Sequence, residues 1–220
     1  RAIATTGQHV WGCKGVVNLI IAQSKLRYSK GAICHSFSTI AIGGFSTHDA
    51  SLGYFNSPMI NVICSVFLLI AALNFSLHYA AASSRTVRNY LHDPEFKAFF
   101  TIQASLIILC FLVLVLSGYY STAEEALDQA MIQAVSISTT AGFATTDFAA
   151  WPTFLPIILI FSSFIGGCAG STGGGLKVIR VFLLFLQGRR EIDRLIHPKA
   201  VYAVKLGERA MPDRVVEAVW

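Results

Sequence analysis

The sequence predicts an all-α polytopic membrane protein built from repeated units. Each unit consists of a membrane helix, a re-entrant pore loop and a second membrane helix, and one helix is broken by glycines. Composition, charge distribution and an internal repeat predict this class. Hydrophobic residues make up 54% of the 220 residues and charged residues 13%, about half of the roughly 25% usual in soluble domains. Mean hydropathy is +0.59. These values disfavour a solvated globule, a disordered chain and a nucleic-acid-binding protein.

Two apolar segments, 59–82 and 98–118, are long enough to cross a membrane. At 1.5 Å per residue each helix would measure about 30 Å or more. The connection 85–97 between them is basic, whereas 119–130 contains acidic residues and no basic ones. Because basic loops stay on the cytoplasmic side, we expect 85–97 to be a cytoplasmic loop and the acidic segment to lie outside.

A third apolar region, 151–187, is interrupted in its middle by the sequence GGCAGSTGGG at 166–175. Glycine costs a helix about 1 kcal/mol per residue relative to alanine, so we expect two half-helices separated by unwound backbone. Such backbone is tolerated at membrane depth only where protein buries it or where it lines a wet cavity. A role of the glycines in close helix packing alone is the open alternative.

An internal repeat with an offset of 98 residues is the strongest signal in the chain. The first copy, FSTIAIGGFSTHD at 37–49, aligns with the second copy, VSISTTAGFATTD at 135–147. Each copy begins in the last residues of a helix that is too short to span, 31–40 or 123–137, and continues into the loop after it. We therefore expect each copy to be a re-entrant pore loop, in which a half-helix enters the membrane and a loop returns to the same side.

The loop of each copy has the composition of a filter for a monovalent cation. Removing water from such an ion requires replacement oxygens, which successive backbone carbonyls can provide, and glycine allows the backbone conformations that this needs. The predicted filter residues are Ile42, Gly43, Gly44, Phe45, Thr140, Ala141, Gly142 and Phe143. Asp49 and Asp147 follow these runs and are expected at the outer mouth, where they would concentrate cations. Ordinary turns between helices are the alternative.

Three motifs resemble the Trk/Ktr family of bacterial potassium-uptake proteins. They are HSFSTIAIGGFSTHDAS, SISTTAGF and SSFIGGCAGSTGGGLKVIR, and the resemblance covers about 32–220. It implies four pore units in one polypeptide. Here 31–84 would be the second unit, 98–187 the third with its broken inner helix, and 188–220 a cytoplasmic segment that leads to a fourth.

The resemblance also implies how the pore is regulated and where it works. A gating loop below the filter would comprise Gly166, Gly167, Gly170, Ser171, Thr172, Gly173, Gly174 and Gly175. The family further implies the bacterial inner membrane, contact with membrane lipid, a homodimer, and a TrkA-like cytoplasmic nucleotide-binding regulatory subunit. Nucleic acid is not an expected partner.

The expected function is passage of dehydrated K⁺ down its gradient. This requires no chemical step, so we expect no enzyme and no directly bound cofactor, with potassium as the only metal and the transported ion. An ion-coupled (H⁺ or Na⁺) potassium symporter and a non-functional membrane fragment are the alternatives. His35 and His78 are expected to be satisfied polar groups. Lys177 either reaches the cytoplasmic interface or borders the pore exit and influences gating.

Residues 1–30 do not fit the repeat. The offset of 98 predicts an outer helix at about 1–20, but this stretch contains Arg1, Gln8, His9 and Lys14 and does not resemble a transmembrane helix. We leave 1–30 unassigned. Because the chain begins with Arg1, we interpret it as a piece of a longer protein.

Overall fold

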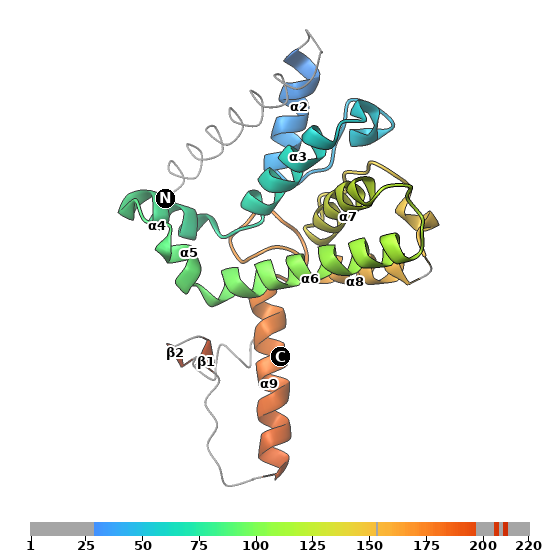
Figure 1. Ribbon diagram of the computed structural model, residues 1–220. Coiled ribbons are helices and arrows are strands. Elements are labelled where there is room, and N and C mark those ends of the chain that lie inside the picture. Colours follow the sequence, from blue (N-terminus) through green and yellow to red (C-terminus); the bar gives the residue numbers. More distant parts are fainter. Residues whose placement is uncertain (1–28, 153, 197–204, 207–208, 211–220) are drawn as a thin grey trace.

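The computed structural model describes residues 29–152, 154–196, 205–206 and 209–210, and it confirms the helical fold class (Figure 1). Residues 1–28 lie outside the described part, and so does nearly all of the unassigned N-terminal segment. The elements are α2 (Ser29–Ile40), η1 (Ser51–Phe55), α3 (Pro58–Ala71), α4 (Phe75–Ser84), α5 (Arg88–His92), α6 (Pro94–Leu116), α7 (Ala123–Ser138), η2 (Phe148–Ala150), α8 (Leu155–Ile165) and α9 (Val178–Ile196). Two short antiparallel strands follow, β1 (Lys205–Leu206) and β2 (Arg209–Ala210).

Helix α6 is the long membrane helix of the described residues. In that part of the chain it is the one helix that meets the length and hydropathy of a span without a bend. Asp93 caps its N-terminus by accepting a hydrogen bond from the Phe96 N–H at 2.8 Å, and Pro94 occupies the first turn, where proline's missing N–H costs nothing. The helix therefore begins before residue 98 and takes in the end of the loop predicted at 85–97.

The predicted span 59–82 is not one continuous helix. It is divided into α3 and α4, which are bent by 91° at the break. Asn74 creates the second N-terminus, because its side chain accepts a hydrogen bond from the Ser76 N–H at 2.8 Å and so replaces a bond of a continuous helix. Hydropathy alone could not show this bend, because both halves are apolar.

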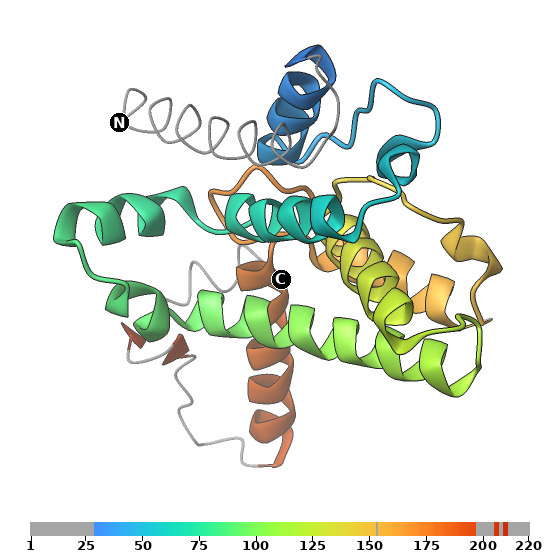
Figure 2. The same ribbon diagram turned by 45° about the horizontal axis from the view of Figure 1, so that its top comes forward.

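Helix α7, the half-helix of the second copy, lies at the centre of the bundle. It packs against α3, α6 and α8, as Figure 2 shows. Ala126, Ala130 and Ala134 are fully or almost fully buried in the cluster that joins α6, α7 and α8. Small side chains at four-residue spacing allow helices to approach closely. The half-helix is therefore held on several sides, and the loop that follows it starts from a fixed point.

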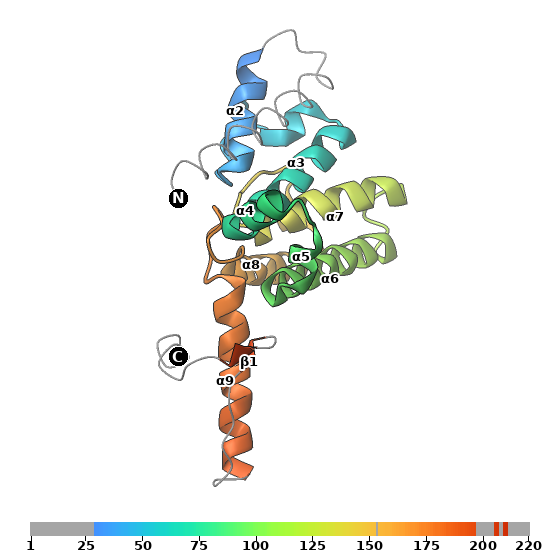
Figure 3. The ribbon, with the colours of Figure 1, turned by 90° about the vertical axis from the view of Figure 1, so that its left-hand side faces the viewer.

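The region 151–187 contains two helices that point in different directions. Helix α8 ends at Ile165 and α9 begins at Val178, and Figure 3 shows α9 projecting away from the rest of the bundle. Helix α9 continues to Ile196 and thus runs into the segment predicted to begin at 188. Residues 166–177 join the two helices as non-helical backbone that lies against the bundle.

Candidate ion-conducting site

The two predicted filter segments have the same backbone conformation at equivalent positions. Ile42 and Thr140 have φ values of 52° and 67°, and Gly44 and Gly142 have φ values of 67° and 86°. These four residues form two pairs at the offset of 98, and each copy has one residue of negative φ between them. Left-handed conformations at alternate positions turn successive peptide groups toward one side, and a β-branched residue at positive φ is rare. The repeat is therefore a repeat of backbone geometry as well as of sequence.

The same hydrogen bonds hold both segments to their half-helices. The Gly43 N–H donates to the Ser38 carbonyl and the Ala141 N–H donates to the Ser136 carbonyl, each at 2.8 Å. These bonds end the half-helices and start the extended loops at the same point of each copy.

The two segments meet each other at Gly44. A Cβ atom on Gly44 would lie 1.9 Å from the carbonyl oxygen of Ala141, whereas a Cβ atom on Gly142 would have no heavy atom within 4 Å. The first copy thus approaches the second so closely that only glycine fits at 44. Among the described residues, the space at 142 is open.

The two copies differ in how their last filter residue is held. Phe143 is 1% exposed and Phe45 is 81% exposed. The Ser136 hydroxyl donates to the Phe143 carbonyl at 2.7 Å, whereas the Ser38 hydroxyl has no hydrogen-bond partner within the described part of the chain. The second segment is therefore fixed by a buried hydrogen bond, whereas the Phe45 side chain of the first segment lies on the surface.

His35 was expected to be a polar group with satisfied hydrogen bonds, and both of its ring nitrogens have partners. The side chain is fully buried, with Nδ1 2.7 Å from the Gly31 carbonyl and Nε2 2.9 Å from the Ser46 hydroxyl. Its ring stacks on that of Phe143 at a centroid distance of 6.3 Å. The His35 imidazole therefore links the two copies a second time, through Ser46 of the first copy and Phe143 of the second.

The glycine loop contacts the end of α2 and the second predicted filter segment. The Thr172 hydroxyl donates to the Ile40 carbonyl at 3.0 Å, at the end of the first half-helix. The Gly174 N–H donates to the Thr140 hydroxyl at 2.8 Å, in the second segment. The loop folds back on itself so tightly that a Cβ atom on Gly166 would lie 2.0 Å from the Gly174 carbonyl oxygen. All eight predicted loop residues belong to this one segment between α8 and α9.

Lys177 points back into the glycine loop, because its ammonium group donates a hydrogen bond to the Gly173 carbonyl. The two roles expected for this residue, at the cytoplasmic interface and at the pore exit, stay predictions. The break between α3 and α4 also contacts the glycine loop. The Cys168 N–H donates to the Ala72 carbonyl at 2.8 Å, and the Phe75 N–H donates to the Gly170 carbonyl at 3.3 Å. The bend that hydropathy missed is thus a docking place for the loop.

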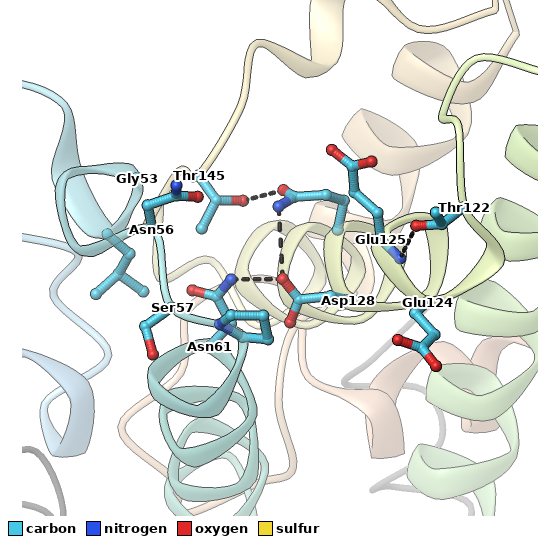
Figure 4. A pocket seen from close by; sticks show the side chains of 12 residues that line it. Gly53, Asn56, Ser57, Asn61, Thr122, Glu124, Glu125, Asp128 and Thr145 are labelled. Carbon is cyan, nitrogen blue, oxygen red and sulfur yellow. Dashed lines mark hydrogen bonds between the residues drawn. The ribbon is translucent and has the colours of Figure 1, made fainter. Parts of the chain in front are cut away.

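A pocket of about 320 Å³ lies on the outer side, between the loop after the first copy and the start of α7 (Figure 4). The Asn61 amide donates to the Asp128 carboxylate at 2.7 Å, and the Thr145 hydroxyl donates to the Gln129 amide oxygen at 2.5 Å. Glu124 and Glu125 also line the pocket. In the sequence these acidic residues served only to predict on which side of the membrane the segment 119–130 lies.

Asp49 and Asp147 follow the predicted filter segments in the sequence and are exposed. Neither lines the outer pocket. Asp147 caps the short helix η2, since its carboxylate accepts a hydrogen bond from the Ala149 N–H at 3.0 Å. In the same outer region the Trp151 indole donates to the Tyr120 hydroxyl at 3.2 Å, and burial raises the pKa of Tyr120.

Glu95 is a residue near the glycine loop that sequence reasoning missed. The residue is 7% exposed, and its carboxylate accepts a hydrogen bond from the Ala169 N–H at 2.6 Å. Sequence analysis assigned Glu95 to the predicted cytoplasmic loop 85–97, and no sequence motif around it indicates a functional role. Within residues 29–152 and 154–196, no group of three or more His, Cys, Asp or Glu side chains is placed to hold a metal ion.

Comparison with known proteins gives one consistent result. The family model described as "TrkH: Cation transport protein" matches residues 10–220, so the match begins earlier than the motifs alone indicate. The Trk system potassium uptake protein TrkH of Vibrio parahaemolyticus is 64% identical over 191 residues, which are 86% of this chain and 39% of that protein. TrkH of Escherichia coli K12 is 59% identical and TrkG of the same strain 40% identical, each over 189 residues, 86% of this chain and 39% of the relative.

The fold also matches a solved structure. The crystal structure of the potassium transporter TrkH from Vibrio parahaemolyticus superposes with a TM-score of 0.92 at 56% identity, over 99% of this chain and 48% of that one. The chain thus spans about 39% of the length of these curated relatives.

Proposed function

This chain belongs to the TrkH family of cation transport proteins, and from that premise we propose that it supplies two pore units of a potassium-uptake pore in the bacterial inner membrane. Each unit would contribute one filter segment, 42–45 or 140–143. K⁺ would pass along their backbone carbonyls down its electrochemical gradient, without a chemical step.

The observation that carries this proposal is the matched geometry of the two segments. Positive φ at Ile42 and Gly44 recurs at Thr140 and Gly142, and the segments touch at Gly44 and Ala141. Carbonyl dipoles can replace the hydration shell of a monovalent cation when several face one path. No Asp, Glu, Lys or Arg occurs within either run, so the selecting groups would be backbone oxygens.

The contacts of the glycine loop support a gating role. Thr172 bonds to the end of the first half-helix at Ile40, and Gly174 bonds to Thr140 of the second filter segment, so an ion that leaves the filter toward the cytoplasm would meet residues 172–174. The loop would therefore have to move for conduction. The partners implied by the family, a second copy of the full-length protein and a cytoplasmic nucleotide-binding subunit, would act on this loop; lipid would surround the exposed apolar faces.

Rubidium flux tests the proposal. Residues 31–196 would replace the matching segment of a full-length TrkH relative, and this chimera would be reconstituted in liposomes with and without Gly142→Ser. We expect the chimera to conduct Rb⁺ in competition with K⁺ rather than Na⁺, and Gly142→Ser to reduce that preference, because a side chain enters the open space beside the carbonyls.

Gly118→Ser is the matched control, because Gly118 also has positive φ (63°) and open space around it but lies at the outer end of α6, away from the filter. A chimera without Rb⁺ flux would contradict the pore. Flux that requires a pH or Na⁺ gradient would indicate a symporter instead.

A further inference from the structure

We propose that Glu95 is the positioning residue that holds the glycine loop in place under the filter segments. This inference rests on the proposed gating function and names the side chain that stabilises the closed position. It starts from the placement of Glu95 in the first turn of α6, where the helix meets the loop.

The Glu95 carboxylate contacts both flanks of the loop. It accepts a hydrogen bond from the Ala169 N–H at 2.6 Å on one flank, and it interacts with the backbone of Ile179 on the other. These two contacts lie ten residues apart in sequence and on either side of 172–174. A single side chain therefore joins the beginning of the loop to the beginning of α9.

Helix capping does not explain this position. Asp93, two residues earlier, caps α6 through the Phe96 N–H, so the helix has its cap without Glu95. A carboxylate that is 7% exposed is costly unless it is hydrogen-bonded and compensated by charge. The hydrogen bond comes from the loop, because the Ala169 N–H donates to the carboxylate. The Lys177 ammonium adds an attraction that is weaker than the repulsion from Asp93. Lys177 in turn bonds to the Gly173 carbonyl.

These contacts connect Glu95 to the residues under the filter. The segment 168–170 is held on one side by the break between α3 and α4, through Ala72 and Phe75, and on the other side by Glu95. Residues 172–174 follow directly, and they bond to the end of α2 at Ile40 and to Thr140 of the second filter segment. Removing the carboxylate frees one side of the loop and leaves the part-buried Ala169 N–H without this acceptor. We therefore expect the loop to leave its place more often.

The first experiment measures Rb⁺ flux of the chimera without its regulatory subunit. Hydrogen bonds to charged groups contribute enough that losing one should shift an equilibrium by about 10-fold or more, so Glu95→Ala should raise basal flux by about that factor. Glu95→Gln should give a smaller rise, because its amide oxygen can still accept from Ala169. Asp93→Asn is the matched control: asparagine can still cap this helix turn, the change removes only the charge that repels Glu95, and basal flux should not rise.

The second experiment reads the loop directly through its own cysteine. Cys168 is 1% exposed, and Cys64 in α3 and Cys110 in α6 are fully buried. In a chimera that retains these three cysteines alone, Glu95→Ala should speed the reaction of Cys168 with a water-soluble maleimide by about 10-fold, the same equilibrium shift. Cys64 and Cys110 should stay unreactive. A purely structural role would expose all three together.

Deletion of 170–174 distinguishes a failure of the proposed gate from a failure of the proposed role of Glu95. If the deletion raises flux and Glu95→Ala changes neither flux nor Cys168 labelling, the role of Glu95 is wrong and the gate stands. If the deletion leaves flux unchanged, the gate is wrong and this inference falls with it. If Glu95→Ala also makes Cys64 reactive, labelling of the Glu95→Gln variant decides. Faster labelling of Cys168 alone in that variant supports the proposal, and labelling unchanged from the parent chimera overturns it.

Discussion

Gly44→Ala is the sharpest perturbation of the proposed filter, because the added atom has nowhere to go. The ideal Cβ position at 44 is 1.9 Å from the Ala141 carbonyl oxygen and 2.9 Å from its carbonyl carbon, whereas real Cβ contacts essentially never fall below 3.0 Å. Both neighbours are backbone atoms, so no side chain can rotate away. The two filter segments would have to separate by about 1 Å, the shortfall from that limit.

The energetic cost has two parts. A non-glycine residue at φ of 67° costs about 1–2 kcal/mol, and forcing an extra methyl group into a packed contact adds about 1–3 kcal/mol. Gly118→Ala is the matched control, since Gly118 has φ of 63° and no heavy atom within 4 Å of its Cβ position. It should therefore show the first part alone.

Both variants would be made in the chimera and measured by thermal unfolding in detergent and by Rb⁺ flux with K⁺ or Na⁺ as competitor. We expect Gly44→Ala to unfold at a clearly lower temperature than Gly118→Ala and to lose its preference for K⁺, because the Ala141 carbonyl is displaced. If Gly44→Ala keeps its K⁺ preference and is no less stable than Gly118→Ala, the close approach of the two segments is wrong.

Three further predictions concern the surroundings of the filter. A double-mutant cycle of Asn61→Ala and Asp128→Ala should give a coupling free energy of about 1.5–3 kcal/mol in unfolding measurements, because their 2.7 Å hydrogen bond joins α3 to α7; a coupling near zero would contradict that bond. Asn74→Ala should cost about 1 kcal/mol of stability through the lost cap of α4, and an unchanged unfolding midpoint would show that the cap is not needed for the bend. Asp147→Asn should weaken Rb⁺ uptake mainly at low ionic strength if its charge concentrates cations, whereas an equal loss at high salt would indicate a structural role.

The local helical elements could be predicted largely from sequence periodicity and length. Half-helices expected at 31–40 and 123–137 are found as Ser29–Ile40 and Ala123–Ser138, and the apolar run at 98–118 is found as Pro94–Leu116. The filter candidates follow from the repeat, because a repeated sequence in a repeated setting adopts a repeated backbone. Their roles in ion selection stay a prediction.

The contacts that distinguish equivalent positions could not be predicted in this way. Gly44 and Gly142 are equivalent in the repeat, yet one touches the neighbouring segment and the other faces open space. The bend at Asn74 was missed because an apolar run reads the same whether it is straight or bent. Its position depends on the Ala72 carbonyl, which bonds to the Cys168 N–H nearly a hundred residues later.

The sequence by itself determined the class of protein, the family and the two loops, because hydropathy, charge placement and motif repetition are properties of neighbouring residues. Only the tertiary structure decided that the glycine loop contacts the end of α2 and the segment 140–143, and that the Glu95 carboxylate bonds to this loop. Glu95 and Ala169 are 74 residues apart, and a lone carboxylate beside a membrane helix has no sequence signature. Its partner is a backbone N–H, which every residue but proline carries, so the pairing becomes visible only when the chain has folded.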